Sequence, residues 1–230
     1  IQNKIKYFFL ENKPKDECGI FGVSNDQNAG NLVALGLHAL QHRGQDSTGI
    51  VTSDKNNFYA HRGMGQVSEV FSNKELLNTL KGSMSIGHNR YGTTGESALK
   101  NVQPLFSELS VGGVAIAHNG NLTNTHQLKE KLIKSGSIFQ STSDTEVILH
   151  LLSTASGTLL ERLTYALNSI SGAYSLLIMT NSKLIGVRDP FGIRPLVLGK
   201  YKNSYILSSE SCGLDTVSYT HLTLPTTHCV

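Results

Sequence analysis

The sequence predicts an α+β protein built as a layered sandwich. Short β-type runs gather towards both ends of the chain and helical patterns gather in the middle, a distribution that favours layered α+β folds over repeating βαβ units. With 230 residues, 39% of them hydrophobic and 16% charged, the chain can bury a core and has the composition of a globular protein. Its 22 glycines against five prolines indicate many tight turns between short elements.

The first two predicted elements follow Cys18 directly. Residues 19–23 form a short apolar run that predicts a strand. Residues 31–41 predict a helix, because apolar residues recur at offsets of 3, 7 and 8 from Leu32 and share one helical face. Further short β-type runs are expected at residues 49–52, 58–61, 85–88, 114–118, 174–180, 184–187, 196–198 and 205–208.

Three more helices are expected in the middle of the chain, at residues 125–135, 144–153 and 159–170. Gly136 follows the first of them as a C-cap, and Gly172 lies near the end of the third. The sequence contains no internal repeat.

Charge and composition exclude several classes of partner. The net charge is only +3, and lysine and arginine occur singly or in pairs, so we expect neither a nucleic-acid nor a membrane-surface partner. The longest apolar stretches, such as residues 174–179, are far shorter than the ~20 residues of a membrane-spanning helix. The three cysteines are widely spaced without a Cys-x-x-Cys pair, and indicate neither a disulfide framework nor a zinc site. A cytoplasmic protein fits these features.

Both ends of the chain differ from the rest. Residues 7–10 are apolar and follow lysines, but they are too few for the ~7-residue apolar core of a signal peptide. The first residue is Ile1 rather than methionine, so we expect the true start to be missing. Residues 218–230 have neither helical nor strand periodicity, and we expect a foreign or misread terminus there, or else a flexible tail.

Cys18 is the first candidate for chemistry. A lone cysteine at the start of a strand is more often a small buried hydrophobe than a nucleophile. Its neighbourhood in the sequence raises the prospect of catalysis, because several clusters of polar residues beside glycine follow it. These clusters occupy residues 41–46, 87–95, 118–121 and 143–146.

Two of the clusters have a structural explanation at helix ends. His42, Arg43 and Gly44 suit a helix C-terminus, where the basic side chains meet the carbonyl groups and the glycine supplies a left-handed cap. Residues 143–146 suit a capping box with serine at the N-cap and glutamate at N3. That arrangement would leave Asp144 at N1, free to face a ligand.

The other two clusters fit structural roles less well. In residues 118–121 the Asn-Gly pair is typical of a hairpin, but a helix rather than a partner strand follows it. Arg90 lies among glycines and threonines, and a cation with hydroxyls and free backbone amides suits a carboxylate, although simple surface exposure is the alternative.

Taken in chain order, these clusters resemble the class II glutamine amidotransferases over residues 16 to about 215. The resemblance implies an N-terminal-nucleophile hydrolase domain, which is a four-layer α/β/β/α sandwich. Within the family, residues 41–45, 101–104 and 189–196 and the short leader are most similar to amidophosphoribosyltransferases of the propeptide-bearing type. The domain division implied is a leader or propeptide at 1–17, the amidotransferase domain at 18–215 and an unmatched tail at 216–230.

By resemblance, Cys18 is the nucleophile that releases ammonia from glutamine through a thioester. Cleavage between Glu17 and Cys18 would free the α-amine that serves as its general base, so that the chain with its leader is an inactive precursor. Asn119, through its side-chain amide, and Gly120, through its backbone N–H, would form the oxyanion hole.

The resemblance also assigns substrate-binding residues. Arg90 would hold the α-carboxylate of glutamine, Asp144 its α-ammonium, Thr93 would line the pocket and Arg43 would orient the region of the nucleophile. Gly92 stands where relatives usually have serine or alanine, a departure that loosens the backbone beside Arg90.

The resemblance implies partners and cofactors as well. The phosphoribosyltransferase domain is missing, and with it the Mg²⁺ site, the phosphoribosyl diphosphate site and the cysteines of a [4Fe-4S] cluster; no metal or cofactor is expected in this part of the chain. The full-length enzyme would make 5-phosphoribosylamine for purine synthesis as a homotetramer. Two alternatives remain: another class II amidotransferase such as glucosamine 6-phosphate synthase, which usually has an aromatic residue at the place of Gln45, or an inactive binding fragment.

Overall fold

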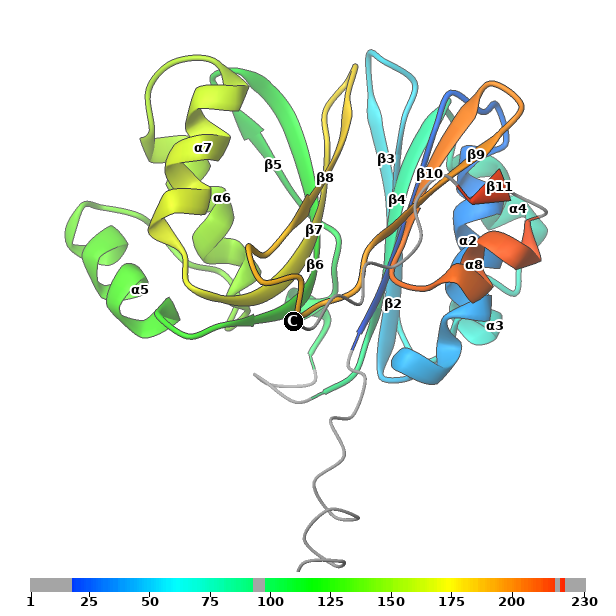
Figure 1. The fold of residues 1–230 in the computed structure, drawn as a ribbon, viewed down its shortest axis with the longest axis horizontal. Coiled ribbons are helices and arrows are strands. Elements are labelled where there is room, and N and C mark those ends of the chain that lie inside the picture. Colours follow the sequence, from blue (N-terminus) through cyan, green and yellow to red (C-terminus); the bar gives the residue numbers. More distant parts are fainter. Residues whose placement is uncertain (1–17, 93–97, 218–219, 222–230) are drawn as a thin grey trace, which may run out of the picture.

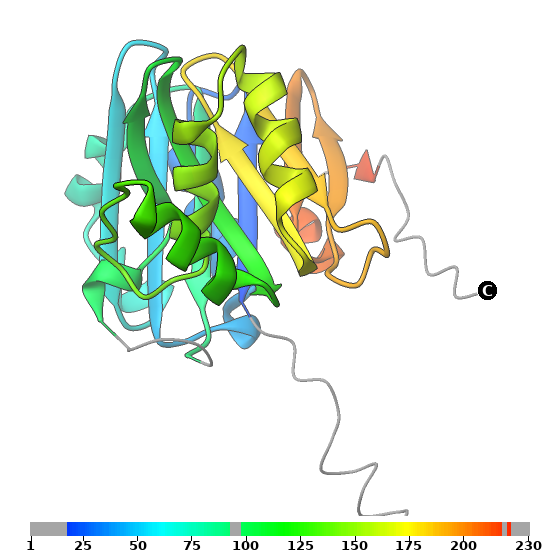
Figure 2. The ribbon, with the colours of Figure 1, turned by 90° about the vertical axis from the view of Figure 1, so that its left-hand side faces the viewer.

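The computed structural model describes residues 18–92, 98–217 and 220–221. Two antiparallel sheets lie face to face, and helices cover the outer side of each (Figure 1). The view from the side shows the helices of the four-stranded sheet lying over its outer face (Figure 2). The prediction of an α+β, four-layer sandwich is confirmed. The leader 1–17, Thr93 and most of the tail lie outside the described residues.

The larger sheet has seven strands in the order β11-β9-β10-β1-β4-β2-β3. Their bounds are β1 Gly19–Ser24, β2 Ser47–Ser53, β3 Phe58–Met64, β4 Met84–Arg90, β9 Val197–Tyr201, β10 Ser204–Ser208 and β11 Thr220–His221. The smaller sheet has four strands in the order β5-β6-β7-β8. Their bounds are β5 Leu105–Leu109, β6 Gly112–Leu122, β7 Gly172–Met179 and β8 Leu184–Arg188.

Each sheet has its own group of helices (Figure 1). The helices beside the larger sheet are α2 Ala29–Ala39, α3 Val67–Val70, α4 Lys74–Thr79 and α8 Ser211–Thr216. Those beside the smaller sheet are α5 Thr125–Lys134, α6 Thr145–Thr154 and α7 Leu159–Ser169. Two short 3₁₀ helices, η1 Gln41–Arg43 and η2 Leu99–Asn101, follow α2 and precede β5. Within the described residues, none of the helices has the length and apolarity that crossing a membrane requires.

The strand β1 shows how the core is layered. Ile20 packs between the two sheets with Ile86 and Leu177, whereas Phe21 packs on the opposite face against α2. Successive strand residues point to opposite faces, and here both faces are covered. That is why β1 is an unbroken apolar run instead of an alternating one. Cys18, directly before β1, therefore lies at one end of the central strands of the double layer, which we call the strand-end edge.

The predicted strands and helices exist, with bounds that differ by a few residues. The sequence patterns missed β5, β11, α3, α4 and α8, which are short elements with little periodicity of their own. The expectation of no strand in residues 218–230 is wrong at Thr220–His221, which pairs with β9. The strand expected at residues 114–118 extends to Leu122 in β6. Residues 118–121 therefore lie inside a strand paired with β7, and the hairpin interpretation is wrong.

Two capping interpretations are also wrong. Gly44 has a φ of −171° and is extended rather than left-handed. Asp144 is the N-cap of α6, not its N1 residue, and it makes no side-chain capping bond. The Glu146 carboxylate accepts hydrogen bonds from the backbone N–H groups of Gln140 and Ser141, so it does not close a capping box on Ser143.

Candidate active site

Cys18 lies directly before β1, next to the end of β4. The antiparallel register pairs Gly19 with Asn89, so Arg90, the last residue of β4, lies beside Cys18. Cys18 itself is partly exposed, whereas Arg90 is 5% exposed. The surface-exposed alternative for Arg90 is therefore wrong. A buried guanidinium needs compensating partners, and this one belongs to the residue that lies beside Cys18 at the end of β4.

Arg43 holds the backbone of Cys18. Its Nε donates a 2.7 Å hydrogen bond to the Cys18 carbonyl oxygen, and its Nη1 donates to Oε1 of Glu210 in an ion pair. The side chain is 1% exposed, so this cation is fixed on both sides. Burial alone would raise the pKa of Glu210, but the hydrogen bond and charge of Arg43, with His42, lower it from its usual value. Arg43 thus joins the start of β1 to the N-cap of α8.

Gly44 brings the next loop against the end of β4. A Cβ atom at this position would lie 2.6 Å from the carbonyl carbon of Arg90. Only glycine permits that approach, and this explains its extended conformation without a left-handed turn. The Asp46 N–H then donates a 3.0 Å hydrogen bond to the Arg90 carbonyl oxygen. The backbone around Arg90 is thereby fixed by two neighbouring segments.

Asn119 and Gly120, near the end of β6 in the other sheet, lie at the same strand-end edge of the double layer. Asn119 is fully buried, and its Nδ2 donates a long hydrogen bond of 3.4 Å to Oγ of Ser209. The same Oγ accepts a 3.0 Å bond from the N–H of Ile20, two residues after Cys18. Gly120 has a φ of +149°, and a Cβ there would meet the carbonyl oxygen of Ala173 at 2.2 Å. Glycine is therefore required at this position of β6.

Asp144 contacts β6 at His118 and Leu122. Its Oδ2 accepts a 3.0 Å bond from the N–H of Leu122, and its Oδ1 lies 3.4 Å from Nδ1 of His118. Burial by itself would raise the pKa of Asp144, but His118 and the N–H groups of Leu122 and Thr145 lower it below its usual value. Asp144 therefore carries a partly enclosed negative charge at neutral pH.

Two buried histidines connect the sheets near this edge. Nε2 of His88, in β4, donates a 3.1 Å bond to the carbonyl oxygen of His118, in β6. The His118 N–H donates a 2.7 Å bond to Oε1 of Gln103. Burial, together with the charges of His118 and Arg90, lowers the pKa of His88 to about 3. His88 is therefore neutral at physiological pH and acts as a hydrogen-bond donor, not as a charge.

The structure thus gathers most of the predicted residues at one edge of the double layer. Arg90 comes from β4 of the larger sheet, Cys18 directly precedes its strand β1, Arg43 comes from η1, and the smaller sheet contributes Asn119 with Gly120. Asp144 joins them through its contacts with β6, whereas Thr93 lies outside the described residues. A thiol, amide donors, a cation and an anion suit a nucleophilic attack on an amide whose substrate carries both charges.

A family model of the glutamine amidotransferase domain matches residues 88–216. The chain belongs to the class II glutamine amidotransferase family. The amidophosphoribosyltransferase of Rhizobium etli is 52% identical over 203 residues, which are 88% of this chain and 41% of that protein. The chloroplastic amidophosphoribosyltransferase of Vigna aconitifolia is 48% identical over 213 residues, which are 92% of this chain and 44% of that protein.

A solved structure gives the same relationship for this member of the glutamine amidotransferase family. The glutamine phosphoribosylpyrophosphate amidotransferase of B. subtilis, in complex with ADP and GMP, superposes with a TM-score of 0.84 at 43% identity. The superposition covers 89% of this chain and 44% of that one. The chain thus spans only 41% to 44% of the length of these relatives.

Two residues at this candidate site were not among those predicted from the sequence. Ser209 links Asn119 to β1, and Glu210 anchors Arg43. Both follow β10, more than 160 residues along the chain from the cysteine motif they support. The run of serines and glutamate directly after an apolar strand was the available signal, since polar residues at strand ends often face a site.

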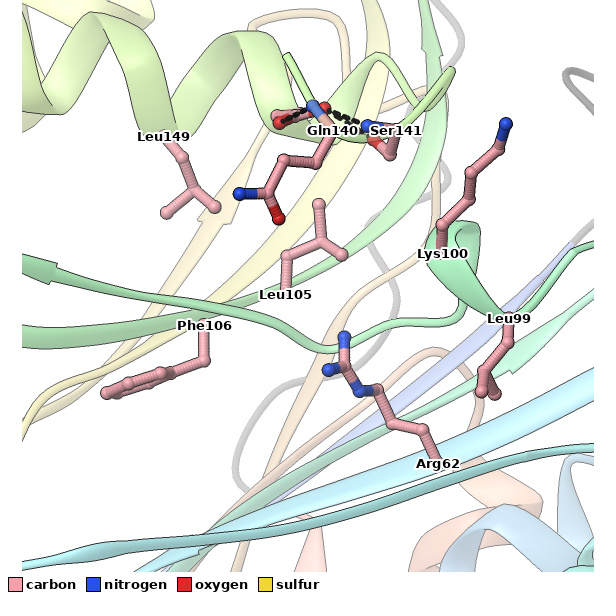
Figure 3. A pocket seen from close by; sticks show the side chains of 9 residues that line it. Arg62, Leu99, Lys100, Leu105, Phe106, Gln140, Ser141 and Leu149 are labelled. Carbon is pink, nitrogen blue, oxygen red and sulfur yellow. Dashed lines mark hydrogen bonds between the residues drawn. The ribbon is translucent and has the colours of Figure 1, made fainter. Parts of the chain in front are cut away.

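A cavity of about 330 Å³ lies elsewhere in the amidotransferase domain, between β3, η2, β5 and the start of α6. Figure 3 shows Arg62, Leu105 and Gln140 among its lining side chains. Among the described residues, none of the predicted site residues lines it. The two cations on its wall, Arg62 and Lys100, are exposed, so the cavity is an open surface hollow apart from the candidate active site.

We expect the free energy of unfolding to decrease as the pH falls below about 6.5, because the buried His88 ring stays neutral in the folded protein. Its folded-state pKa of about 3 lies below the ordinary value of 6.5, so between these values the unfolded chain binds a proton that the folded chain does not. The free energy of unfolding then decreases by about 1.4 kcal/mol for each pH unit. Between pH 7 and pH 5, urea unfolding should detect a loss of about 2 kcal/mol from this one residue.

The variant His88→Asn should reduce that pH-dependent loss by about 2 kcal/mol. His126→Asn is the matched control, because His126 is 87% exposed, and it should leave the loss unchanged. If His88→Asn does not fold, an NMR titration of the His88 ring in the unaltered protein decides the matter. A titration midpoint near the ordinary value would contradict the prediction.

Proposed function

We propose that residues 18–215 are a glutaminase domain that releases ammonia from glutamine through a thioester on Cys18. The observation that carries this proposal is the pair of contacts on either side of the nucleophile. Arg43 holds the carbonyl of Cys18, and Ser209 ties Asn119 to the strand that Cys18 begins. A thiol and an amide donor from two different sheets are thereby held at one edge, as acyl transfer requires.

In the proposed reaction, removal of residues 1–17 frees the α-amine of Cys18 as a general base. The amine takes the thiol proton while sulfur attacks the side-chain amide carbon of glutamine, and the C–N bond breaks as that proton passes to the leaving ammonia. Water then cleaves the thioester, giving glutamate and the free thiol. Asn119 Nδ2 and the Gly120 N–H stabilise the oxyanion, and the 3.4 Å bond from Asn119 to Ser209 is long enough to be exchanged for it.

The two charged ends of glutamine have oppositely charged partners in this proposal. Arg90 pairs with the α-carboxylate, and Asp144, whose lowered pKa keeps it ionised, pairs with the α-ammonium. Arg43 acts through the backbone of Cys18 and is a positioning residue. Thr93, carried over from the family, completes the pocket.

For the whole protein, we propose transfer of this ammonia to phosphoribosyl diphosphate, giving 5-phosphoribosylamine in purine synthesis by a homotetramer. The transfer reaction is supported by the names of the relatives, which are more than twice as long as the segment that this chain matches. The Mg²⁺ and the [4Fe-4S] cluster implied by the family belong to that further portion, and the glutaminase step uses neither. A cytoplasmic location remains a prediction, and one of these relatives is chloroplastic by name.

A glutamine analogue with an electrophilic diazoketone tests the site directly. In a chain that begins at Cys18, we expect it to alkylate Cys18 and to spare Cys212, because burial and the charge of Glu210 raise the pKa of the Cys212 thiol. Peptide mass mapping measures the labelling, and excess glutamine should protect Cys18. Iodoacetamide, which lacks the charged ends of glutamine, is the matched control reagent and should show no such protection. Equal labelling of Cys212 and Cys18 by the analogue would contradict the proposal.

A further inference from the structure

Three potential metal ligands meet beside Arg43, on the side away from Cys18. His42 comes from η1, Glu210 is the N-cap of α8, and Cys212 is the second residue of that helix. Nε2 of His42 lies 3.0 Å from Oε2 of Glu210, and Sγ of Cys212 lies 3.5 Å from the same oxygen. All three ligand atoms lie within 4.8 Å of one another.

These separations are close to those of a metal site. With zinc bonds of about 2.0 to 2.3 Å at tetrahedral angles, neighbouring ligand atoms lie about 3.3 to 3.6 Å apart. The two contacts to Glu210 have nearly this spacing, and the nitrogen and sulfur atoms lie within 4.8 Å of each other. The His42 side chain is 53% exposed, so rotation of its ring is open and a water molecule can reach the fourth position.

We propose that His42 Nε2, Glu210 Oε2 and Cys212 Sγ bind a divalent cation of the zinc class. Imidazole and thiolate ligands select Zn²⁺ over Mg²⁺ and Ca²⁺, which prefer oxygen. Binding releases the proton of the Cys212 thiol to solvent. None of the three ligands touches glutamine in the proposed glutaminase reaction, although Glu210 also anchors Arg43.

The second oxygen of Glu210 gives this site a supporting contact. Oε1 accepts a hydrogen bond from Arg43, so the carboxylate can offer Oε2 to the metal while Oε1 remains held. Metal-binding carboxylates are usually oriented by such an outer hydrogen bond. The same Arg43 donates to the Cys18 carbonyl. A bound ion would therefore tie η1 to α8 directly behind the residue that positions Cys18, and stabilise the folded chain.

Cobalt titration tests the site. The protein is the full chain carrying Cys18→Ala and Cys229→Ala, so that Cys212 is its sole thiol. We expect one equivalent of Co²⁺ to produce a sulfur-to-cobalt charge-transfer band in the near ultraviolet, and Zn²⁺ to abolish it by displacement. Zn²⁺ should also raise the thermal unfolding midpoint, whereas Mg²⁺ at the same concentration should not.

Variants in the same background distinguish this site from general metal binding. Cys212→Ser should remove the band, and His42→Asn should weaken Zn²⁺ binding by at least about 10- to 100-fold. His38→Asn changes a nearby exposed histidine of α2 and should have no effect. A band that persists in Cys212→Ser, or Zn²⁺ affinity unchanged in His42→Asn, would overturn the proposal. If Cys212→Ser does not fold, the exposed His42 variant decides alone.

Discussion

Replacing Cys18 with alanine, in a chain that begins at residue 18, should reduce glutamine hydrolysis by roughly a thousandfold or more. The substitution removes the sulfur that forms the thioester and leaves Arg43 bonded to the backbone carbonyl, which alanine retains. The free energy of unfolding should change by about 1 kcal/mol or less, since the side chain is small and partly exposed. Ammonia release and urea unfolding measure the two quantities on the same sample.

Cys229→Ala is the control for the loss of a thiol and should hydrolyse glutamine at the unaltered rate. Glutamine hydrolysis retained in Cys18→Ala would show that Cys18 is not the nucleophile. Activity lost together with the fold would be detected by the unfolding measurement, and Cys18→Ser, which keeps a hydroxyl of similar size, then separates the two. A folded serine variant with full activity would also contradict the assignment.

Asp144→Asn should raise the KM for glutamine by about ten- to a hundredfold. The α-ammonium would lose a charge-assisted bond of roughly 1.5 to 3 kcal/mol, while asparagine still offers an oxygen to the N–H of Leu122. The thermal midpoint should fall only modestly, because asparagine has nearly the same size as aspartate and retains an acceptor for that N–H group. Steady-state kinetics and thermal unfolding of the same variant measure both effects.

A purely structural role for Asp144 leads to the opposite pattern. The contact with His118 would then be the whole function of the carboxylate, so its loss would lower stability and leave KM unchanged. Glu130→Gln is the matched control, because it removes an exposed carboxylate in α5 that is 60% exposed and should alter neither quantity. An unchanged KM in Asp144→Asn would contradict the proposed pairing of Asp144 with the α-ammonium of glutamine.

Local patterns were enough to locate most of the fold. The apolar run of β1 and the helical spacing of α2 reflect burial that each segment requires by itself, and the structure confirms both. The order of polar clusters along the chain was also enough to indicate the family. These features are encoded within stretches of about ten residues, where hydrophobic period and turn residues act directly on the backbone.

Contacts between distant segments decided the rest. Gly44 looks like a helix cap in the sequence, yet it is extended because the backbone of Arg90 lies against it. Asn119 and Gly120 look like a turn, yet pairing with β7 keeps them in a strand.

Local residue patterns specify the strands and the long helices, because each depends on neighbouring residues, and the order of the motifs singles out Cys18 as the candidate nucleophile. Only the tertiary structure brought Glu210 to Arg43 across 167 positions and to His42 across 168. Arg90 is buried in the packed structure, and Asn119 of the smaller sheet is joined to β1 of the larger sheet through Ser209. The physical reason is that hydrogen bonds and ion pairs across such distances form only after both sheets have packed, and no local pattern specifies them.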